Sequence, residues 1–554
     1  RHLRPLVGLA ADDMTGDRPG EAFAAWRRFL EAVAEGGPTV LVFEDLHWAD
    51  DGLLDFVDGL VDWVDGVSLL VVCTARPELL DRRPGWGGGK RNATTVSLTP
   101  LGGDATARLV HALLDRPLVD AETQQALVER AAGNPLYAEE FVRMVEAGGT
   151  VEGRLPETVQ GIVAARIDLL PAAEKELLQY AAVLGKVFWS DALLSLGGSE
   201  PWQVSETLRS LERKEFVRRE HRSAVAGATQ HAFVHALVRD AAYNQLPRSA
   251  RAERHVAAAE WIESLPEDRA EDRAETLAHH YLTGLELRRA AGEDVEQLGA
   301  RASAALQEAG ARALALGALR AAAGFLSHAL DLLPAGQDPS PELLFAAGKA
   351  FGFVGREGNE LERAVEAFEA KDDLERAAEA ALEASRHEWY GGAATGSRFW
   401  LDRASDLVAG RPPSRAKAYV LAEQSRQAML DFQYETAAEL AEAAVALARE
   451  IGDEEIHADA LVTQGSCEIS LGNRSGLRTI ERGIALAGGR GRVAGRGYNN
   501  LSWAWTVLGD LSQSRRVSEE GIRVSELEGD EQGLWFQRGN LVGGYYSGGE
   551  WDDA

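Results

Sequence analysis

The 554-residue chain has few cysteines and no long apolar run, and both shortages narrow its class. Its two cysteines, Cys73 and Cys467, lie far apart and form no metal-ligand spacing. Such usage argues against a disulfide framework and suits a reducing cytosol, so we expect a cytoplasmic protein. No stretch approaches the roughly 18 apolar residues that a membrane helix needs. The first residue is arginine, and no signal peptide is visible.

The chain also has fewer basic residues than acidic ones. The chain has 58 Lys and Arg against 87 Asp and Glu, and its formal net charge is −29. A general nucleic-acid binder needs a basic face that neutralises phosphates, so nucleic acid is not an expected partner of this portion. With 45% hydrophobic and 26% charged residues, the composition is typical of globular domains, and the length predicts about three or four of them.

The sequence lacks a P-loop, the G-x-x-x-x-G-K-[ST] element that cradles phosphate between a strand and a helix. Residues 85–91, Gly-Trp-Gly-Gly-Gly-Lys-Arg, resemble one. However, a proline precedes them, and a polar Asn-Ala-Thr-Thr follows where a helix is required. We interpret them as a flexible surface loop. In P-loop proteins this element lies well upstream of the strand that ends in acidic residues, here residues 40–45. The last residues also look like the middle of a repeat, so we expect a fragment that is open at both ends.

Residues 40–43 are four apolar residues that lead directly into Glu44 and Asp45. Such a run predicts a strand of a parallel sheet that is buried on both faces. Acids at its carboxyl end lie where open α/β sheets bind ligands. One carboxylate can hold Mg²⁺ while its neighbour polarises a water for attack on phosphate, as in a Walker B segment. The alternative is a buried strand that ends in a solvated acidic turn.

A helix at 51–64 and a second apolar strand at 67–73 predict a βαβ unit. This topology brings both strand ends to one edge of the sheet. Thr74 and Arg76 should therefore lie beside the two acids, where a cation can contact a γ-phosphate. The alternative for Arg76 is an ordinary surface arginine before a proline turn.

The rest of the first domain predicts a short strand at 96–101 and helices at 104–114, 121–131 and 137–146. Gly133, Asn134 and Pro135 precede the last helix, and a proline at the start of a helix is a typical start signal. Taken by itself, this Gly-Asn-Pro segment could be simply an interhelical turn.

Three segments together resemble a known family. They read Val-Phe-Glu-Asp-Leu-His-Trp-Ala-Asp at 42–50, Thr-Ala-Arg-Pro-Glu at 74–78 and Gly-Asn-Pro-Leu-Tyr at 133–137. In this order they resemble the STAND branch of AAA-like signal-transduction ATPases. More narrowly, they resemble the ATPase–TPR portion of actinobacterial adenylate/guanylate cyclase-like proteins and of large ATP-binding LuxR-type regulators.

The resemblance implies ATP and Mg²⁺ as ligands. It makes Glu44 and Asp45 the catalytic and metal-binding Walker B pair and Arg76 a sensor arginine, with Thr74 beside it. Pro135, with Gly133 and Asn134 next to it, would touch the adenine or the ribose. The first acid of the pair is often aspartate in this fold and is Glu44 here, so the division of roles between the acids stays open. The missing P-loop is the larger departure from the family pattern.

We assign residues 1–150 to the C-terminal part of the ATPase domain and 151–250 to a winged-helix-like arm with a short two-stranded wing. Charges in the arm are mixed, so a regulatory arm is preferred to a DNA-binding one. Residues 251–295 predict a helical linker, in which His279-His280-Tyr281 is interpreted as packing.

Residues 296–554 predict TPR-like helical repeats, because glycine-containing landmarks recur about every 40 residues. The repeats between 335 and 415 are degenerate. A solenoid of this kind binds a protein or a small ligand. Its aromatic residues could line the binding face, although we interpret most of them as packing between helices. The landmarks are Leu430-Asp431, Leu471-Gly472-Asn473, Leu508-Gly509-Asp510 and Gly548-Gly549-Glu550, and the aromatic residues are Trp389, Tyr390, Trp400, Tyr498, Trp503, Trp505, Trp535, Tyr545 and Tyr546.

The predicted fold class is therefore α/β followed by all-α: a partial P-loop NTPase with a parallel sheet, a winged-helix-like arm and a TPR-like α-solenoid. The predicted function is an ATP-binding signal-transduction ATPase coupled to a TPR sensor within a nucleotide cyclase-like protein, with nucleotide-driven oligomerisation as a further expectation. One alternative is a non-catalytic TPR scaffold with a degenerate ATPase core. Another is the ATPase–TPR part of a LuxR-type transcriptional regulator. Without a P-loop, these 554 residues should bind ATP weakly or not at all.

Overall fold

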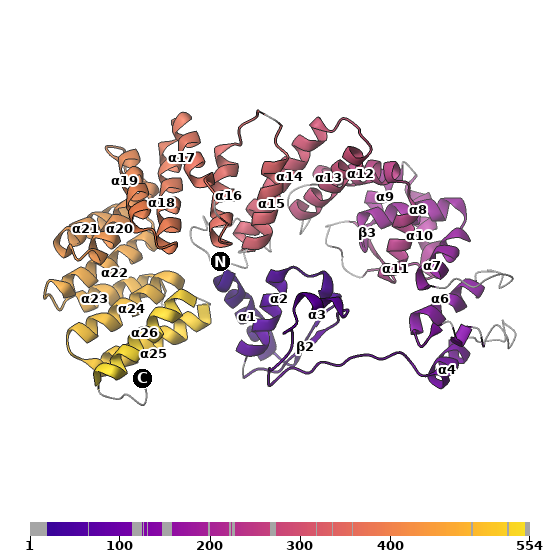
Figure 1. Cartoon of the computed structure of the whole chain (residues 1–554), viewed down its shortest axis with the longest axis horizontal. Helices are drawn as coiled ribbons and strands as arrows, with labels where there is room; N and C mark the ends of the chain where they lie inside the picture. The colour runs from indigo at the N-terminus through magenta and orange to yellow at the C-terminus, as the bar shows by residue number, and fades with distance from the viewer. Residues whose placement is uncertain are drawn as a thin grey trace. The chain divides into compact units, whose positions relative to one another are not determined.

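Helices make up most of the chain in this computed structural model (Figure 1). The described residues are 19–64, 66–113, 125, 127–129, 131–146, 158–197, 200–220, 223, 228–265, 273–316, 318–334, 336–356, 358–488, 491–528 and 531–548. None of the helices within these ranges is long and apolar enough to cross a membrane.

The chain divides into two compact units. One comprises Arg1–Ala93, Gly310–Asp331 and Ala335–Ala554, and the other comprises Thr94–Ala309 and Leu332–Pro334. The domain boundaries predicted from the sequence stay predictions, and the one at 150 lies outside the described residues.

The first unit begins with a parallel pair of strands, β1 (Thr39–Phe43) and β2 (Leu69–Cys73), aligned from Thr39 opposite Leu69 to Phe43 opposite Cys73. Helix α2 (Asp51–Trp63) connects them, and α1 (Pro19–Glu35) precedes β1. The strand–helix–strand order and the parallel pairing are confirmed. A larger P-loop sheet is not confirmed, because the described part of this sheet has two strands.

Burial alternates along β1, and one prediction fails here. Thr39, Leu41 and Phe43 are half-buried, whereas Val40 and Val42 are 58% and 59% exposed. The prediction of a strand buried on both faces is therefore wrong for the described structure. A pleated strand turns successive side chains to opposite faces, and an apolar residue is buried only where another element covers its face.

A small core supports the carboxyl end of β1. It contains Leu46, Leu54 and Leu79, each with 2% or less of its surface exposed, and Phe43 and Trp86 pack against them. These residues come from the strand end, from the short helix η2 (Leu46–Trp48), from α2 and from α3 (Glu78–Arg82) and the turn after it. Hydrophobic packing therefore supports the backbone next to Glu44 and Asp45.

Residues 96–101 form no strand, so that prediction is wrong; Leu98 there is 93% exposed and packs against no sheet. Helices α4 (Gly103–Leu113) and α6 (Pro135–Glu146) confirm two of the three predicted helices, and Pro135 is the first residue of α6 as expected. The helix predicted at 121–131 lies largely outside the described residues.

The arm packs helices on an antiparallel sheet with the strand order β3-β5-β4. The predicted wing of two strands is wrong in one respect, because a third strand, β3 (Val187–Trp189), pairs with β5 (Gln230–Phe233), which also pairs with β4 (Val217–Arg219). Phe188 and Phe233 have no exposed surface. The helices are α7 (Val159–Asp168), α8 (Ala172–Leu184), α9 (Ser190–Gly197), α10 (Pro201–Arg213) and α11 (Ala236–Gln245).

Helices α12 (Arg248–Ser264) and α13 (Arg273–Ala290) follow the arm and pack against each other. The first unit then resumes within α14 (Glu296–Ala315) and continues through α15 (Leu319–Asp331). The helical character predicted for this linker is confirmed over the described residues.

The remaining helices form successive hairpins, which confirms the predicted helical repeats (Figure 1). Even-numbered helices from α16 to α26 also contact the next even-numbered helix, and we call the surface that they form the even-helix face. The helices are α16 (Pro341–Phe353), α17 (Glu360–Ala370), α18 (Leu374–Tyr390), α19 (Ala394–Val408), α20 (Arg415–Leu430), α21 (Tyr434–Ile451), α22 (Glu454–Ser470), α23 (Gly476–Leu486), α24 (Gly491–Val507), α25 (Leu511–Glu528) and α26 (Glu531–Gly548).

The sequence landmarks mark the tight turns of these hairpins. Gly472 and Gly509 have φ values of 85° and 83°, a left-handed conformation that glycine adopts without strain. Phe432 takes the equivalent turn position with φ 61° and no such freedom. Hairpins are also present between 341 and 408, where the sequence repeats are degenerate. The last landmark extends to Gly549 and Glu550, which lie outside the described residues.

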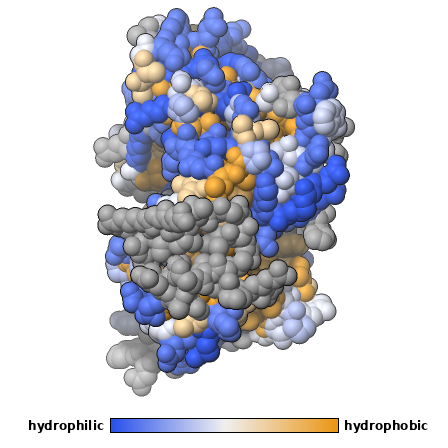
Figure 2. Space-filling model, turned by 90° about the vertical axis from the view of Figure 1, so that its right-hand side faces the viewer, coloured by the Kyte–Doolittle hydropathy of each residue, from blue (hydrophilic) through white to orange (hydrophobic). Residues whose placement is uncertain are grey.

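Some aromatic residues of the repeats pack between helices and others are exposed. Trp400, Tyr498, Trp503 and Trp505 are partly buried and pack against hydrophobic clusters between helices. Trp535 on α26 is instead 81% exposed. On the face drawn in Figure 2, hydrophilic residues prevail and hydrophobic ones form small groups.

Candidate functional site

The carboxyl ends of β1 and β2 bring four predicted site residues to one edge of the sheet. Glu44 and Asp45 directly follow β1, and Thr74 and Arg76 follow β2. All four are exposed. Because the strands are parallel, their ends meet at one edge, as predicted, and this edge is open to solvent.

Thr74 holds the turn that carries the acids. The Asp45 N–H donates to Thr74 Oγ1 over 3.2 Å, and the Leu46 N–H donates to the Thr74 carbonyl over 2.9 Å. Asp45 itself is left-handed, with φ 58° and ψ 37°, a conformation that aspartate tolerates better than most residues. These bonds fix the backbone between β1 and η2 and so fix the direction in which the Asp45 side chain leaves the sheet.

His47 is a site residue to which the sequence analysis gave no role, although it belongs to the Leu-His-Trp-Ala-Asp segment. Its Nδ1 accepts from the Arg76 N–H over 3.4 Å, so it links the two strand ends. Its Nε2 is buried and has no hydrogen-bond partner among the described residues. The neighbouring Trp48 ring lies 5.1 Å from the imidazole and is 77% exposed.

Arg82, the last residue of α3, and Arg83, which follows it, hold η2 and the start of α2 in place through polar contacts. Arg82 donates from Nη1 to the His47 carbonyl over 3.0 Å. Arg83 bonds Asp51 and Asp55 of α2, with N–O distances of 2.9 and 2.8 Å. The Arg83 guanidinium holds the pKa of Asp51 below its ordinary value, mainly through its hydrogen bond. Asp51 is thereby engaged with α3 and the turn after it, whereas Glu44 and Asp45 are exposed at the strand end.

The described residues fit one part of a nucleotide site. Carboxylate and hydroxyl oxygens are the hard ligands that Mg²⁺ accepts, with water completing its shell. A phosphate cradle does not occur among residues 19–93. Lys90 of the P-loop-like segment is paired with Asp62 at 2.5 Å and Asp58 at 3.0 Å on α2, and no helix directly follows it. Residues 85–91 are therefore no P-loop, as predicted, whereas the flexibility expected of them stays a prediction and Trp86 packs against the small core.

The Gly133-Asn134-Pro135 turn lies in the other compact unit. Asn134 caps α6, since its Oδ1 accepts from the Leu136 N–H over 3.0 Å and from the Tyr137 N–H over 3.4 Å. Such a cap satisfies backbone donors at the start of a helix.

Gly133 has a structural requirement of its own. Its φ is 80°, and a Cβ at this position would lie 2.4 Å from the Leu101 carbonyl oxygen. The Gly133 carbonyl also accepts from the Leu101 N–H over 2.9 Å. Local packing thus explains the glycine and the asparagine. Contact of Pro135 with a nucleotide stays a prediction, as does its membership of one site with Glu44 and Asp45.

A second candidate surface is the even-helix face, where polar side chains join neighbouring helices. Arg496 of α24 donates from Nε to Asp459 of α22 over 3.0 Å, and Asn540 of α26 donates to Asn499 Oδ1 over 2.8 Å. Further along, a shallow depression spans α16, α18 and α20, and Arg386 lies 4.6 Å over the Tyr419 ring beside it. The depression is lined by Phe345, Glu379, Glu383, Arg415, Ala416 and Tyr419.

No family model matches the chain. Over 256 residues it is 29% identical to an uncharacterized protein of Rhizobium meliloti (strain 1021). The match covers 42% of this chain and 23% of that protein, so the chain spans about a quarter of its relative's length.

Solved structures with some likeness to this chain include the following three. One is a STAND protein with a tetratricopeptide repeat sensor from Pyrococcus horikoshii (14% identity, TM-score 0.47, 96% of this chain and 74% of that one). Another is the apo quorum sensor NprR of B. thuringiensis (11%, 0.41, 66% and 93%), and a third is yeast Tom70 (12%, 0.26, 79% and 92%). At these TM-scores the likenesses do not establish the fold, which is established by contacts within the chain itself.

Proposed function

We propose that the chain is the regulatory ATPase and sensor part of a cytoplasmic signal-transduction protein, in which the helical repeats read a partner and the acidic sheet edge acts on ATP. The observation that carries this proposal is the convergence of Glu44, Asp45, Thr74 and Arg76 at the carboxyl edge of β1 and β2. The segments that carry these residues resemble those of STAND ATPases, and this resemblance supports the same proposal.

When bound, Mg²⁺–ATP would supply the phosphate to be attacked and the cation that offsets its charge. Of the two exposed acids, one would bind the metal and the other would orient the attacking water. Thr74 would keep Asp45 in place through its hydrogen bond to the Asp45 N–H. Arg76, adjacent in space to His47, would offer positive charge to the phosphate as charge develops on it.

Asp45→Asn in the full-length protein tests this assignment. Removing a carboxylate that acts on the water or the metal should lower ATP turnover by roughly 10²–10⁴-fold while nucleotide binding persists. Asp81→Asn on α3 is the matched control, since Asp81 is also exposed but does not lie at the strand ends. Unchanged turnover in Asp45→Asn would refute the catalytic assignment.

We further propose that ATP binding needs a phosphate loop that these 554 residues do not contain. Calorimetry on residues 1–554 should then detect weak ATP binding or none. Tight Mg²⁺–ATP binding by this chain would contradict the proposal. A cyclase domain or a LuxR-type helix-turn-helix elsewhere in the gene would identify the output, and the flanking sequence distinguishes the two.

A non-catalytic scaffold is the second candidate function, favoured by the polar and aromatic residues of the even-helix face. In this case the repeats would hold a protein segment while the ATPase core is degenerate. A photo-crosslinking residue in place of Trp535 should then give one discrete adduct in cells of the source organism. The same replacement at Phe432, which is 77% exposed on a hairpin turn, is the control and should give none. Loss of signalling in full-length Asp45→Asn would count against the scaffold.

A further inference from the structure

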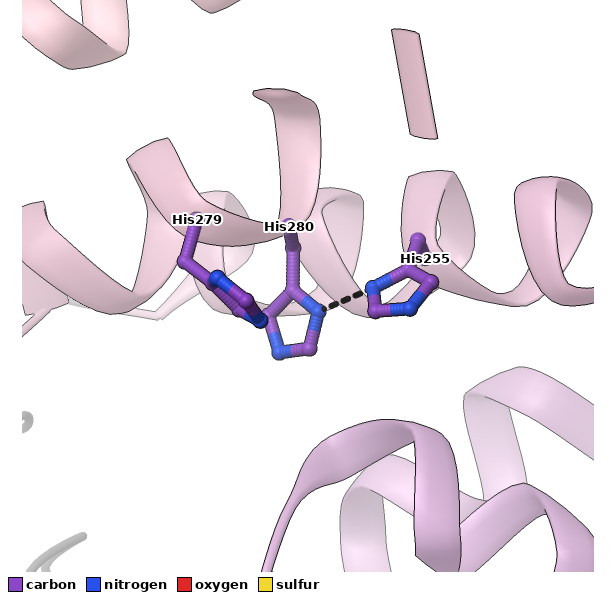
Figure 3. Close-up of side chains that lie close together, drawn as sticks. All are labelled: His255, His279 and His280. Carbon is purple, nitrogen blue, oxygen red and sulfur yellow. Dashed lines mark hydrogen bonds between the residues drawn. The ribbon is translucent and has the colours of Figure 1, made fainter. Parts of the chain in front are cut away.

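Three histidines from two neighbouring helices gather at one point in the second unit. His255 lies on α12, and His279 and His280 are consecutive on α13. Figure 3 shows the three imidazoles side by side between these helices. One ring nitrogen from each lies within 4.8 Å of those of the other two.

The closest pair already has almost the spacing of two ligands on one ion. His255 Nδ1 and His280 Nδ1 are 2.9 Å apart, joined by a hydrogen bond (Figure 3). Zinc–nitrogen bonds are 2.0–2.1 Å, so two nitrogens on a tetrahedral Zn²⁺ lie about 3.3 Å apart. A small separation of the two rings would admit an ion, and His279 needs a shift on the order of 1 Å to reach it.

Tyr243 of α11 orients the first of these rings. Its hydroxyl lies 3.0 Å from His255 Nε2. Histidines that bind metals commonly donate their other ring N–H to an oxygen, which fixes the tautomer and leaves the opposite nitrogen free for the metal. With Nε2–H donated to Tyr243, Nδ1 of His255 points at His280 as a ligand atom.

Burial keeps these rings in the form that binds metals. Desolvation lowers the pKa of His255 to about 3 and holds the pKa of His280 well below its ordinary value. The pKa of His279 is also lowered, mainly because neighbouring groups desolvate its ring even though part of the residue is exposed. Neutral imidazole is the metal-binding form, so no ring has to lose its charge at pH 7, and the Nδ1 proton that His280 shares with His255 moves to Nε2 of His280 when the ion binds. His255 and His280 are 1% exposed, whereas His279 is exposed and offers a route from solvent.

Nearby charges oppose a cation only in part. Arg239 and Arg251 lie 5.0 and 4.6 Å over the Tyr243 ring. Arg239 is paired with Asp240 at 3.1 Å, which offsets its charge. Glu286 of α13 acts on His279 in the opposite sense to the arginines. The net field lowers the affinity for a dication without removing the ligand set.

We propose that His255, His279 and His280 form a binding site for a divalent transition metal ion, with Zn²⁺ as the expected occupant and a fourth position open to water. Three imidazoles select zinc and its neighbours over Mg²⁺ or Ca²⁺, which prefer oxygen ligands. The ion would join α12 to α13 just before the repeats. The packing role expected from the sequence for His279-His280-Tyr281 fits Tyr281 and His280, which are each 1% exposed, but not the exposed His279.

Isothermal titration of Zn²⁺ into the chelator-treated chain tests the site without any nucleotide. One Zn²⁺ per chain is expected, together with slower hydrogen exchange in peptides of α12 and α13. His279→Ala should weaken binding at least tenfold, and because His279 is exposed this variant should keep its fold. His328→Ala removes an exposed helical histidine outside the cluster and should leave binding unchanged.

Tyr243→Phe sharpens the test, because it removes the hydrogen bond that orients His255 and removes no ligand. It should weaken binding by roughly 10–100-fold. The proposal is overturned if the wild-type chain takes up no stoichiometric Zn²⁺, or if His279→Ala binds it as tightly as wild type. It is also overturned if His328→Ala lowers the affinity as much as His279→Ala does. The three histidines would then be a hydrogen-bonded packing cluster.

Discussion

The two small sheets in the described part of the molecule place apolar strand residues in different surroundings. In the parallel pair, Val40 and Val42 leave more than half of their surface exposed. In the sheet of the arm, Phe188 and Phe233 have none exposed. An apolar run therefore predicts a strand, whereas burial depends on what covers each face.

Their polar residues differ in the same way. Glu44 and Arg76 at the parallel sheet are exposed. Where the arm packs on α6, Arg166 of α7 pairs with fully buried Glu140 of α6, and the Arg143 guanidinium bonds the same carboxylate over 2.8 Å. Solvated groups can exchange water for a ligand at little cost, but a buried charge needs its partner. The first arrangement suits binding, and the second suits structure.

The largest expected effect comes from truncating a covered strand residue. Phe233→Ala should lower the opening free energy of the arm by about 3–5 kcal/mol, because it leaves a cavity. Val42→Ala in β1 should cost less than about 1 kcal/mol, because much of that side chain is already in water. Hydrogen exchange with mass spectrometry measures both locally. Equal losses of opening free energy in the two sheets would contradict the claim that the surroundings decide how much each apolar side chain contributes.

The charged residues give the next effect. Arg166→Ala should destabilise α6 and α7 by about 3 kcal/mol, the lower end for a broken buried pair, because Arg143 still contacts Glu140. Arg76→Ala is the matched change at an exposed arginine and should leave the stability of the parallel sheet unchanged. The same hydrogen-exchange experiment measures both variants. An Arg166→Ala protein as stable as the wild type would show that the buried pair is dispensable.

Acid should open the α12–α13 hairpin. Unfolded His255 titrates near 6.5 and the folded residue near 3, so the unfolded state binds more protons between these values. Stability should therefore be fully present above pH 6.5. It should fall by roughly 1.4 kcal/mol for each pH unit below that, for this histidine alone. The groups that act on His255 are Tyr243, His279, His280, Arg239 and Arg251.

Exchange protection of α12 and α13, corrected for the intrinsic rate at each pH, measures this loss between pH 7 and pH 5. A His255→Gln variant should show a shallower dependence. Protection that does not change over this range in the wild-type chain would mean that His255 is not kept neutral by burial.

The smallest effect should be the same in both regions. Asp50 caps α2 by accepting from the Leu53 N–H over 2.7 Å, and Thr158 caps α7 by accepting from the Gly161 N–H over 3.1 Å. Replacing either by alanine should cost about 1 kcal/mol, because a cap is a local bond that needs no tertiary cover. Glu35→Gln at an exposed helix end is a control expected to have no effect. A cost confined to one of the two caps would show that the surroundings matter even there.

Local signals predicted the local elements. The apolar runs predicted β1 and β2, Pro135 predicted the start of α6, and the glycine landmarks predicted the hairpin turns at Gly472 and Gly509. These features depend on a few neighbouring residues. Val187–Trp189 escaped prediction as a strand because three residues show no periodicity, and β5, its partner, is distant in sequence.

The candidate sites show the same limit. Glu44 and Asp45 stood out because acids directly follow an apolar run, and parallel strands then required Thr74 and Arg76 to be near. His47 became a link between the strands only through its contact with the Arg76 N–H. His255 and His280 are 25 positions apart, and no spacing rule connects them.

The sequence by itself determined β1, α2 and β2 in that order, the acidic residues after β1 and the repeat period, because each follows from neighbouring residues and backbone geometry. Tertiary structure alone decided which face of β1 is open, which carboxylates are exposed or buried, and that three histidines meet. Burial, desolvation and ligand geometry depend on distant segments packing together, and a linear pattern does not contain that information.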